Sequence, residues 1–414
     1  MQQKLILLAV AAFASGAAFA QTNRPASSQQ QQQRPAQSSG SASTQANRPA
    51  QSQPQKPVQA TPAKPVLSLY GTDISIYGTA DVGVTHRRDA KRTVDPNNLR
   101  LSPPGPHTAI DSGLSEPSML GFKAEKNLGN GTKALVVLET MYKSDLGTQW
   151  DKRFSPAYVG LSGGFGTAIA GRLVAPLYAF QKDLDPFNDG TVGRSMNAVF
   201  EGDYTEFVDN AIAYVSPSMG GFTITGAFST NAGGMDNYDN NDGDARVFTV
   251  LPRYTKGSFD AGAGLQYVNI KGSDPTTWGL KMLLGASYDF RLIKLSTAYN
   301  YIQTDGAAER KMHTMLVGVS VPFGKHAIQT SLNMSKIMDV GDAGLFAVGY
   351  TYTLYEGLNF FAAFARAEND DGRLVGTADA SNPGAYCHGD ENCFTGVDAG
   401  VWRTAIQAGL KYKF

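Results

Sequence analysis

From about residue 67 to residue 414, hydrophobic and polar side chains alternate along the chain with a period of two. Between residues 401 and 414, one set of alternate positions is apolar with aromatic residues near both ends, and the other set is polar or small. The same alternation covers 278–290 and 222–229. Alternation of this kind is typical of strands with two different faces. A strand of a soluble β-sandwich shows the same alternation, so the connections between the strands must distinguish a sandwich from a membrane barrel.

The connections alternate between short turns and long loops. Short ones cover 128–131 and 163–166, and long ones cover 174–206 and 368–400. Turns at one rim and loops at the other are typical of an outer-membrane barrel, and an even number of strands closes without a free edge. We therefore predict an all-β fold, a 16-stranded antiparallel transmembrane β-barrel. Its predicted strands cover residues 73–87, 118–127, 132–144, 153–162, 167–173, 207–216, 222–229, 246–256, 259–271, 278–290, 294–303, 309–322, 326–338, 344–354, 358–367 and 401–414.

The first 66 residues have a different character. Residues 1–20 read as a signal peptide, with a cation at Lys4, a short apolar run and a cleavage site between Ala20 and Gln21. A membrane anchor is the alternative, but the apolar run is too short for it. Residues 21–66 are rich in Gln, Pro, Ser and Ala and repeat a cation beside proline, so we expect a disordered extension. It is either a spacer or a cationic strap for peptidoglycan or the pore mouth. The barrel is assigned to 67–414.

The composition narrows the function classes. The chain has 414 residues with 36 Lys+Arg and 36 Asp+Glu, and its mean hydropathy is −0.24. That hydropathy argues against a polytopic helical membrane protein. Six basic and no acidic residues precede residue 67, so the body is acidic. It has no basic stripe for nucleic acid, no Walker motif and only scattered histidines. We expect no nucleic-acid partner, no cofactor, no metal and no enzymatic activity.

Two local motifs have ordinary explanations. Cys387 and Cys393 are the only cysteines, and an even pair in a secreted protein predicts a disulfide. A metal site with His388 is the alternative, but its fourth ligand is unclear. Residues 129–134 fit the dinucleotide pattern G-x-G-x-x-A, yet they lie between two amphipathic strands. Asn130-Gly131 is therefore predicted as a hairpin turn.

Several stretches of the body resemble the general diffusion porins of Gram-negative outer membranes, in particular the β-proteobacterial type. They follow the family's order from about residue 68 to 414, which makes the resemblance more specific than any single motif. The extension 21–66 lies outside it. The matching stretches are Leu69-Tyr70-Gly71, Ile76-Tyr77-Gly78, Ser118–Lys123 with Leu128–Ala134, Ala157–Gly166 with Gly171-Arg172, Asp209–Pro217 and Gly409–Phe414.

The resemblance implies an outer-membrane homotrimer surrounded by lipid and lipopolysaccharide. It implies that the third loop folds into the pore and that small hydrophilic solutes pass through. It also implies that the C-terminal residues, here Tyr412 and Phe414, form part of the signal read by the barrel assembly machinery.

By position, residues 174–206 are the third loop. An acidic loop that faces cations on the opposite wall would set a transverse field, and charge and width are how such channels select. Many members carry Arg where Met119 stands, so we expect a weak cation preference. The acidic candidates of the constriction are Asp183, Asp185, Asp189, Glu201, Asp203 and Glu206. The basic candidates of the pore wall are Lys123, Arg172, Arg253, Lys281 and Arg403.

The predicted function is passive diffusion of small hydrophilic solutes through a water-filled barrel. One rival is a substrate-specific channel of the same fold, which would show a saturable affinity for its solute. The other is a surface adhesin or cell-wall tether built on a barrel, with binding carried by the long loops or by the extension 21–66.

Overall fold

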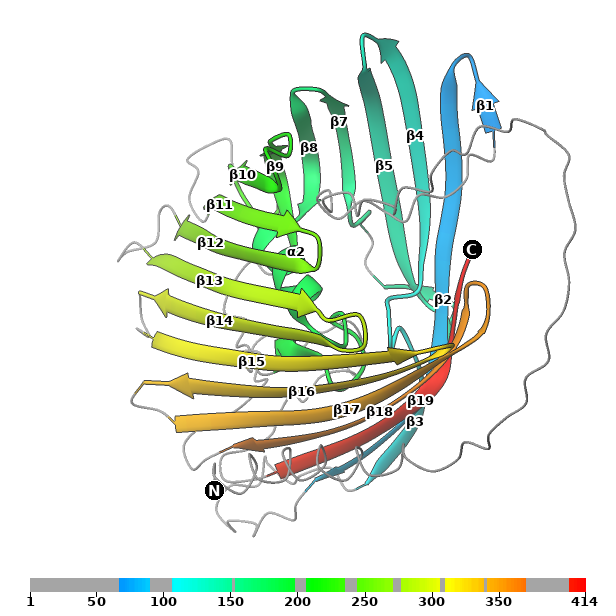
Figure 1. Cartoon of the computed structure of the whole chain (residues 1–414), viewed down its shortest axis with the longest axis vertical. Helices are drawn as coiled ribbons and strands as arrows, with labels where there is room; N and C mark the ends of the chain where they lie inside the picture. Colours follow the sequence, from blue (N-terminus) through cyan, green and yellow to red (C-terminus); the bar gives the residue numbers. More distant parts are fainter. Residues whose placement is uncertain are drawn as a thin grey trace, which may run out of the picture. The chain divides into compact units, whose positions relative to one another are not determined.

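The strands form one closed antiparallel sheet. The computed structural model describes residues 67–89, 106–150, 153–197, 206–234, 244–270, 277–305, 310–338, 341–369 and 402–414. Each long strand pairs with its neighbours, and β19 pairs with β2, so the sheet closes into a barrel (Figure 1). The sixteen wall strands among the described residues are β2 (Thr72–Asp89), β4 (Met119–Gly129), β5 (Thr132–Lys143), β7 (Ala157–Gly163), β8 (Gly166–Val174), β9 (Phe207–Val215), β10 (Phe222–Ser229), β11 (Ala245–Lys256), β12 (Phe259–Ile270), β13 (Thr277–Asp289), β14 (Lys294–Thr304), β15 (Arg310–Phe323), β16 (His326–Ile337), β17 (Gly341–Tyr355), β18 (Leu358–Asn369) and β19 (Trp402–Lys413).

The distribution of apolar side chains is the reverse of that in a soluble domain. On β13, Met282 and Leu284 point outward and are 40% and 49% exposed, whereas Leu283 points inward and is fully buried. Large apolar side chains are exposed on the same outward face around the sheet. Such a continuous apolar exterior needs lipid around it. Among the described residues, no helix has the length and apolar character needed to cross a membrane.

The predicted barrel and its sixteen strands are confirmed, with small shifts at the ends. The strand predicted to begin at residue 153 begins at Ala157, because residues 153–156 form a bent segment that ends in Pro156. Three short strands were not predicted: β1 (Leu67–Leu69), β3 (His107–Ser112) and β6 (Thr148–Gln149).

Strand β3 changes the shape of the first long loop. β3 continues the pairing of β2, and β4 then pairs with the earlier part of β2. Residues 113–118 between β3 and β4 leave the wall and are largely buried inside the barrel. The alternating pattern contains no signal for this turn, because the turn is too short to show a period.

One hairpin turn and the seam illustrate how the strand order is fixed. Asn130 and Gly131 have φ values of 50° and 74°, the left-handed conformation of a tight hairpin, which confirms the turn prediction. At the seam, the backbone of Phe414 exchanges two hydrogen bonds with Gly78, at 3.0 and 3.1 Å. A Cβ at Gly78 would lie 2.6 Å from the Phe414 ring, so glycine is needed there.

Candidate functional site: the third loop inside the barrel

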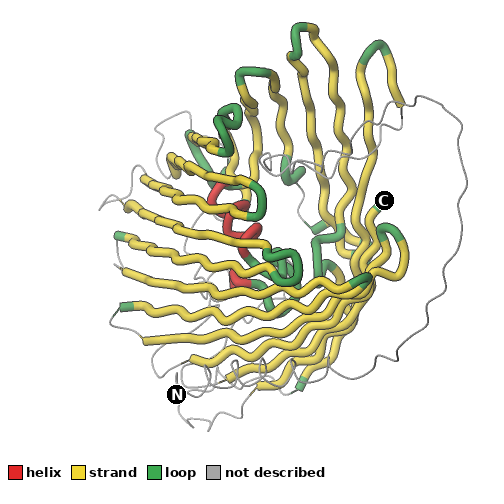
Figure 2. Tube along the Cα trace, viewed as in Figure 1, coloured by secondary structure: helices red, strands yellow, loops and turns green. Residues whose placement is uncertain are grey.

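The third loop, predicted as 174–206, begins after Val174, the last residue of β8, and carries the only α-helix among the described residues. Helix α2 (Pro176–Leu184) starts with proline at its first turn, where no backbone N–H is needed, and ends at Asp185 before Pro186. It packs against the inner faces of β11 to β14 (Figure 1), and Figure 2 shows it within the ring of strands. Its buried side includes Leu177, Phe180 and Leu184. A short 3₁₀ turn, η1 (Ser195–Asn197), follows.

A track of inward-facing glycines receives the loop. Gly262 on β12 and Gly285 on β13 are direct register partners, so side chains are missing at neighbouring points of the wall. A Cβ at any of these glycines would collide with an apolar side chain of the loop. Glycine weakens a strand, but it allows this close approach. The contacts are Leu177 over Gly264, Phe180 over Gly262, Leu184 over Gly285, Pro186 over Gly318 on β15 and Phe187 over Gly349 on β17.

The far end of the loop is fixed by hydrogen bonds to the wall and to the turn 113–118. The Thr191 N–H donates to the Leu114 carbonyl, and the Val192 N–H donates to Oε1 of Gln407 at 2.8 Å. The turn itself is held by Asp81 on β2, whose carboxylate accepts the N–H groups of Leu114, Ser115 and Glu116 at 2.9 to 3.1 Å. The loop is therefore attached at both ends.

Two acidic residues hold the loop together from inside. Asp185 accepts the N–H of Phe187 at 3.0 Å and that of Ser195 at 2.6 Å. Asp189 pairs with Arg194, Nε to Oδ1 at 2.9 Å, and also accepts the hydroxyl of Tyr178. Counted over the whole residue, Asp185 and Asp189 are 5% and 6% exposed. Their placement differs from the expectation that they line the passage, because the loop needs buried acceptors to satisfy its own N–H groups.

The other acidic candidates are placed as follows. Asp183 forms an ion pair with Arg253, Nη1 to Oδ2 at 2.7 Å, and burial raises its pKa above the usual value. The carboxylate of Glu206 accepts the Tyr178 hydroxyl at 3.3 Å. Glu201 and Asp203 lie outside the described residues. The described acidic groups thus form hydrogen bonds or ion pairs within the protein. Because their charges are paired, the transverse electric field that they could set across the passage is strongly reduced.

The basic candidates lie on the inward face, but most are paired. Arg253 contacts Asp183 and Asp260 and lies 4.9 Å from the Phe180 ring centre, so it supports α2. Arg172 pairs with Asp209 and donates to Ser155 at 2.9 Å. Lys123 pairs with Glu125 on its own strand at 3.3 Å.

The remaining basic candidates are Lys281 and Arg403. Lys281 is 8% exposed. Arg403 lies on β19 in register with Asp89 and Ala367. The side chain of Arg403 is outside the description, as are the cysteines Cys387 and Cys393, the cleavage site at Ala20 and Gln21, and the extension 21–66.

Four charged groups inside the barrel were missed. Glu116, on the turn 113–118, pairs with Lys411 at 3.2 Å and with Lys413 at 2.6 Å. Although burial acts in the opposite direction, these two ammonium groups lower the pKa of Glu116. Glu139 on β5 accepts the hydroxyl of Tyr77 at 2.6 Å. The period of two places Lys411, Lys413 and Glu139 at inward-facing positions, so the sequence could have indicated them. No pattern in the sequence indicates that the turn 113–118, which carries Glu116, folds inward.

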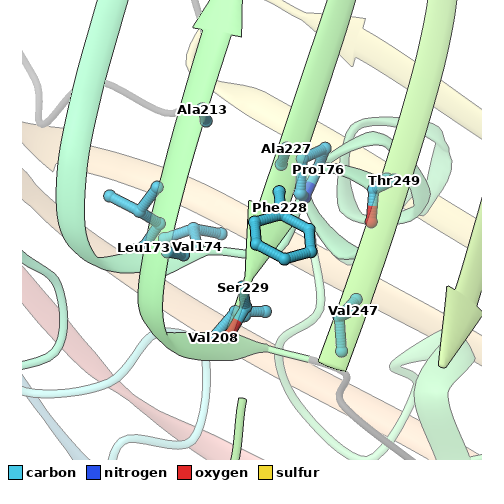
Figure 3. Close-up of a pocket in the computed structure, with 11 residues that line it drawn as sticks. Leu173, Val174, Pro176, Val208, Ala213, Ala227, Phe228, Ser229, Val247 and Thr249 are labelled. Carbon is cyan, nitrogen blue, oxygen red and sulfur yellow. The ribbon is translucent and has the colours of Figure 1, made fainter. Parts of the chain in front are cut away.

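A small apolar cavity lies where β8 leads into α2, as Figure 3 shows. It is lined by residues such as Leu173, Val174, Pro176, Val208 and Phe228. Ser229 and Thr249 are the only side chains of its lining with a hydroxyl. Because few polar groups converge there, we treat it as a packing defect at the base of the loop and not as a ligand site.

The loop should become more stable as pH falls from 7 to 5. Burial raises the pKa of Asp185 from 3.8 to about 6, so the folded loop binds a proton more tightly than the open loop does. The folded loop therefore gains stability as pH falls through 6. Between pH 7 and pH 5, protection from amide exchange at Ser195 should increase roughly ten-fold after correction for intrinsic exchange rates. Asp183 titrates in the same direction, so Asp185→Asn is the control that isolates Asp185. An unchanged pH dependence in this variant would contradict the assignment.

The family model described as "Gram-negative porin" matches residues 7–372. The chain belongs to the Gram-negative porin family. Outer membrane porin protein 32 of Delftia acidovorans is 26% identical over 309 residues, with 72% of this chain and 84% of that protein covered. The family match and the β-barrel together indicate that this protein is located in the outer membrane.

Solved porins share the fold. A structure titled anion-selective porin from Comamonas acidovorans aligns with a TM-score of 0.68 at 22% identity, covering 83% of this chain and all of that one. OmpT of Vibrio cholerae in a trimer form aligns with a TM-score of 0.56 at 12% identity, covering 83% of this chain and all of that one. At these identities, the two structures support the porin fold alone.

Proposed function

We propose that this porin lets small hydrophilic solutes diffuse passively and without catalysis through the gap between the third loop and the wall. The observation that carries the proposal is the docked loop. Apolar side chains of α2 and of the residues that follow it occupy the glycine track on β12 to β17, so the loop narrows the barrel on one side. Charged side chains of the turn 113–118 and of β19, namely Glu116, Lys411 and Lys413, also lie inside the barrel.

Liposome swelling tests passive diffusion. Vesicles with the purified protein should swell in uncharged sugars at rates that fall steeply with sugar size and rise linearly with concentration. Saturation at low concentration of one solute would favour the rival, a substrate-specific channel. Vesicles that do not swell in any sugar would contradict the proposal.

We propose a weak anion preference, in place of the weak cation preference expected from the sequence. The acidic loop does not support the earlier expectation, because Asp183 and Asp189 are paired with arginines. The neighbour from Comamonas acidovorans is titled anion-selective, which agrees with the proposal. Lys411 and Lys413 share the single carboxylate of Glu116 inside the barrel, so this group of three charges has a net positive charge.

The reversal potential under a potassium chloride gradient should have the sign of anion preference. Replacing Lys123 and Lys182 together by Gln should lower the chloride-to-potassium permeability ratio by about two- to five-fold, because unit charges a few ångströms from an aqueous path contribute about 1 kcal/mol or less. Lys325→Gln, in the exposed turn between β15 and β16, is the matched control. A cation-selective wild-type protein would contradict the proposal.

Partners are proposed on the family resemblance. We propose a homotrimer, in keeping with the trimer form of the OmpT neighbour, embedded in lipid and lipopolysaccharide. We also propose that Tyr412 and Phe414 are read by the barrel assembly machinery and that Cys387 and Cys393 form a disulfide. The extension 21–66 is a candidate strap for peptidoglycan. Retention of the full chain, but not of a chain without residues 22–60, on isolated peptidoglycan would support the tether role.

A further inference from the structure

Two lysines of the last strand converge on one carboxylate inside the barrel. Lys411 and Lys413 lie on the inward face of β19, because they share the parity of Gln407, whose side chain contacts the third loop. Two positions apart on a strand, their Cα atoms are about 7 Å from each other. Both ammonium groups nevertheless reach Oε2 of Glu116 in the turn 113–118, at 3.2 Å from Lys411 and 2.6 Å from Lys413. The two cations therefore point toward the same place.

The two ammonium groups are not saturated by this carboxylate. A lysine ammonium group has three N–H donors and no acceptor. Lys411 donates to Glu116 and, at 3.1 Å, to the hydroxyl of Ser115. Lys413 donates to Glu116 at 2.8 Å. Because these hydrogen bonds use only part of the donors in the described structure, the rest can bind water or the oxygen atoms of a solute.

The cluster is accessible from inside the barrel. The side chain of Lys413 is 39% exposed, and those of Lys411 and Glu116 are 18% and 23% exposed. Because these side chains point inward, their exposed parts face the lumen and not the lipid. Asp81, the register partner of Lys411, is fully buried, and its carboxylate accepts the N–H groups of the turn. On its accessible side, the cluster thus presents two cations and one anion.

We infer that Lys411, Lys413 and Glu116 form a weak subsite for small multivalent oxyanions, such as phosphate, on the diffusion path. The inference rests on the proposed function as a diffusion pore and names a solute class for it. A phosphate ion has several acceptor oxygens and more than one negative charge, so it can accept hydrogen bonds from both ammonium groups at once. Glu116 acts as an internal counter-ion that keeps this binding weak, which lets the solute leave again.

Inhibition of the chloride current by inorganic phosphate tests the subsite in single channels formed by the full chain. In potassium chloride at slightly alkaline pH, phosphate should reduce the wild-type current in a saturable way. Lys413→Gln should raise the half-inhibiting phosphate concentration roughly three-fold, and Glu116→Gln should lower it roughly three-fold, because each removes one unit charge a few ångströms from the bound anion. Loss of packing would shift both variants in the same direction, so opposite shifts identify an electrostatic site.

The outcomes separate the subsite from the pore. Lys325→Gln, in the exposed turn between β15 and β16, is the matched control and should keep the wild-type half-inhibiting concentration. Phosphate that does not reduce the wild-type current, or unchanged inhibition in both cluster variants, would overturn the subsite while the current itself shows an intact pore. If Lys413→Gln fails to assemble, Glu116→Gln decides alone, because it leaves β19 unchanged. Wild-type protein that inserts but carries no current would overturn the proposed function, and the subsite with it.

Discussion

Replacing Gly285 by Leu is expected to displace the third loop and to raise the single-channel conductance. A Cβ at this position would collide with Leu184, and the surrounding wall is β-sheet that cannot move aside. Overpacking of this kind costs about 1–3 kcal/mol, and undocking α2 is the easiest way to relieve it. The conductance in planar bilayers should rise, and larger sugars should permeate vesicles.

Two further variants make this experiment decisive. Gly279→Leu is the matched control, because Gly279 lies on the same inward face of β13 and its nearest neighbours would be 3.9 Å from a Cβ. Its conductance should equal that of the wild type. Adding Leu184→Ala to the Gly285 variant removes the colliding methyl groups and should restore a low conductance. A Gly285→Leu protein with wild-type conductance and sugar exclusion would show that α2 does not depend on the glycine track.

Replacing Arg194 by Leu should be the most damaging single change inside the loop. Arg194 and Asp189 are buried together, with side chains 3% and 1% exposed, and Tyr178 donates its hydroxyl to the same carboxylate. Without the guanidinium, Asp189 is left buried without its charge partner, and a broken buried pair typically costs about 3–5 kcal/mol. The loop should open locally while the barrel persists. Limited proteolysis of the folded protein should then cut within residues 185–197.

The matched control for this change is Arg153→Leu. Arg153 also pairs with an aspartate, Asp209 at 3.0 Å, but its side chain is 53% exposed. Pairs of that kind contribute about 0–1 kcal/mol, so the loop should stay resistant. Replacing Arg194 and Asp189 together by apolar residues should restore part of the protection, because no charge is then left buried. Equal cleavage of the Arg194→Leu protein and the wild type would contradict this account of the loop.

Most of the barrel could be predicted from the sequence because each strand has two faces in different solvents. Lipid selects apolar side chains on one face and the lumen accepts polar or small ones on the other, so the period of two survives along every wall strand. The prediction of strand ends was less accurate where the chain bends before the strand begins, as at residues 153–156. The short strands β1, β3 and β6 were missed because so few residues cannot show a period.

The site could be predicted only in part, since its residues depend on where the third loop docks. Acidic residues of the loop were expected to line the passage, but Asp185 and Asp189 serve its internal hydrogen bonds. A charge count cannot tell an exposed carboxylate from one that satisfies backbone donors. Glycines at inward positions of four wall strands were the available signal for the docking track. The inward turn that carries Glu116 had no counterpart in the pattern.

Single-channel recording of the purified protein in a planar bilayer tests the central claim most directly. The claim is that the closed barrel, narrowed but not blocked by its docked loop, conducts ions at rest. In symmetrical potassium chloride the account predicts discrete current steps of uniform size, proportional to voltage and to salt concentration. Well-folded protein that inserts into the bilayer but gives no steps would contradict it and indicate a plugged barrel.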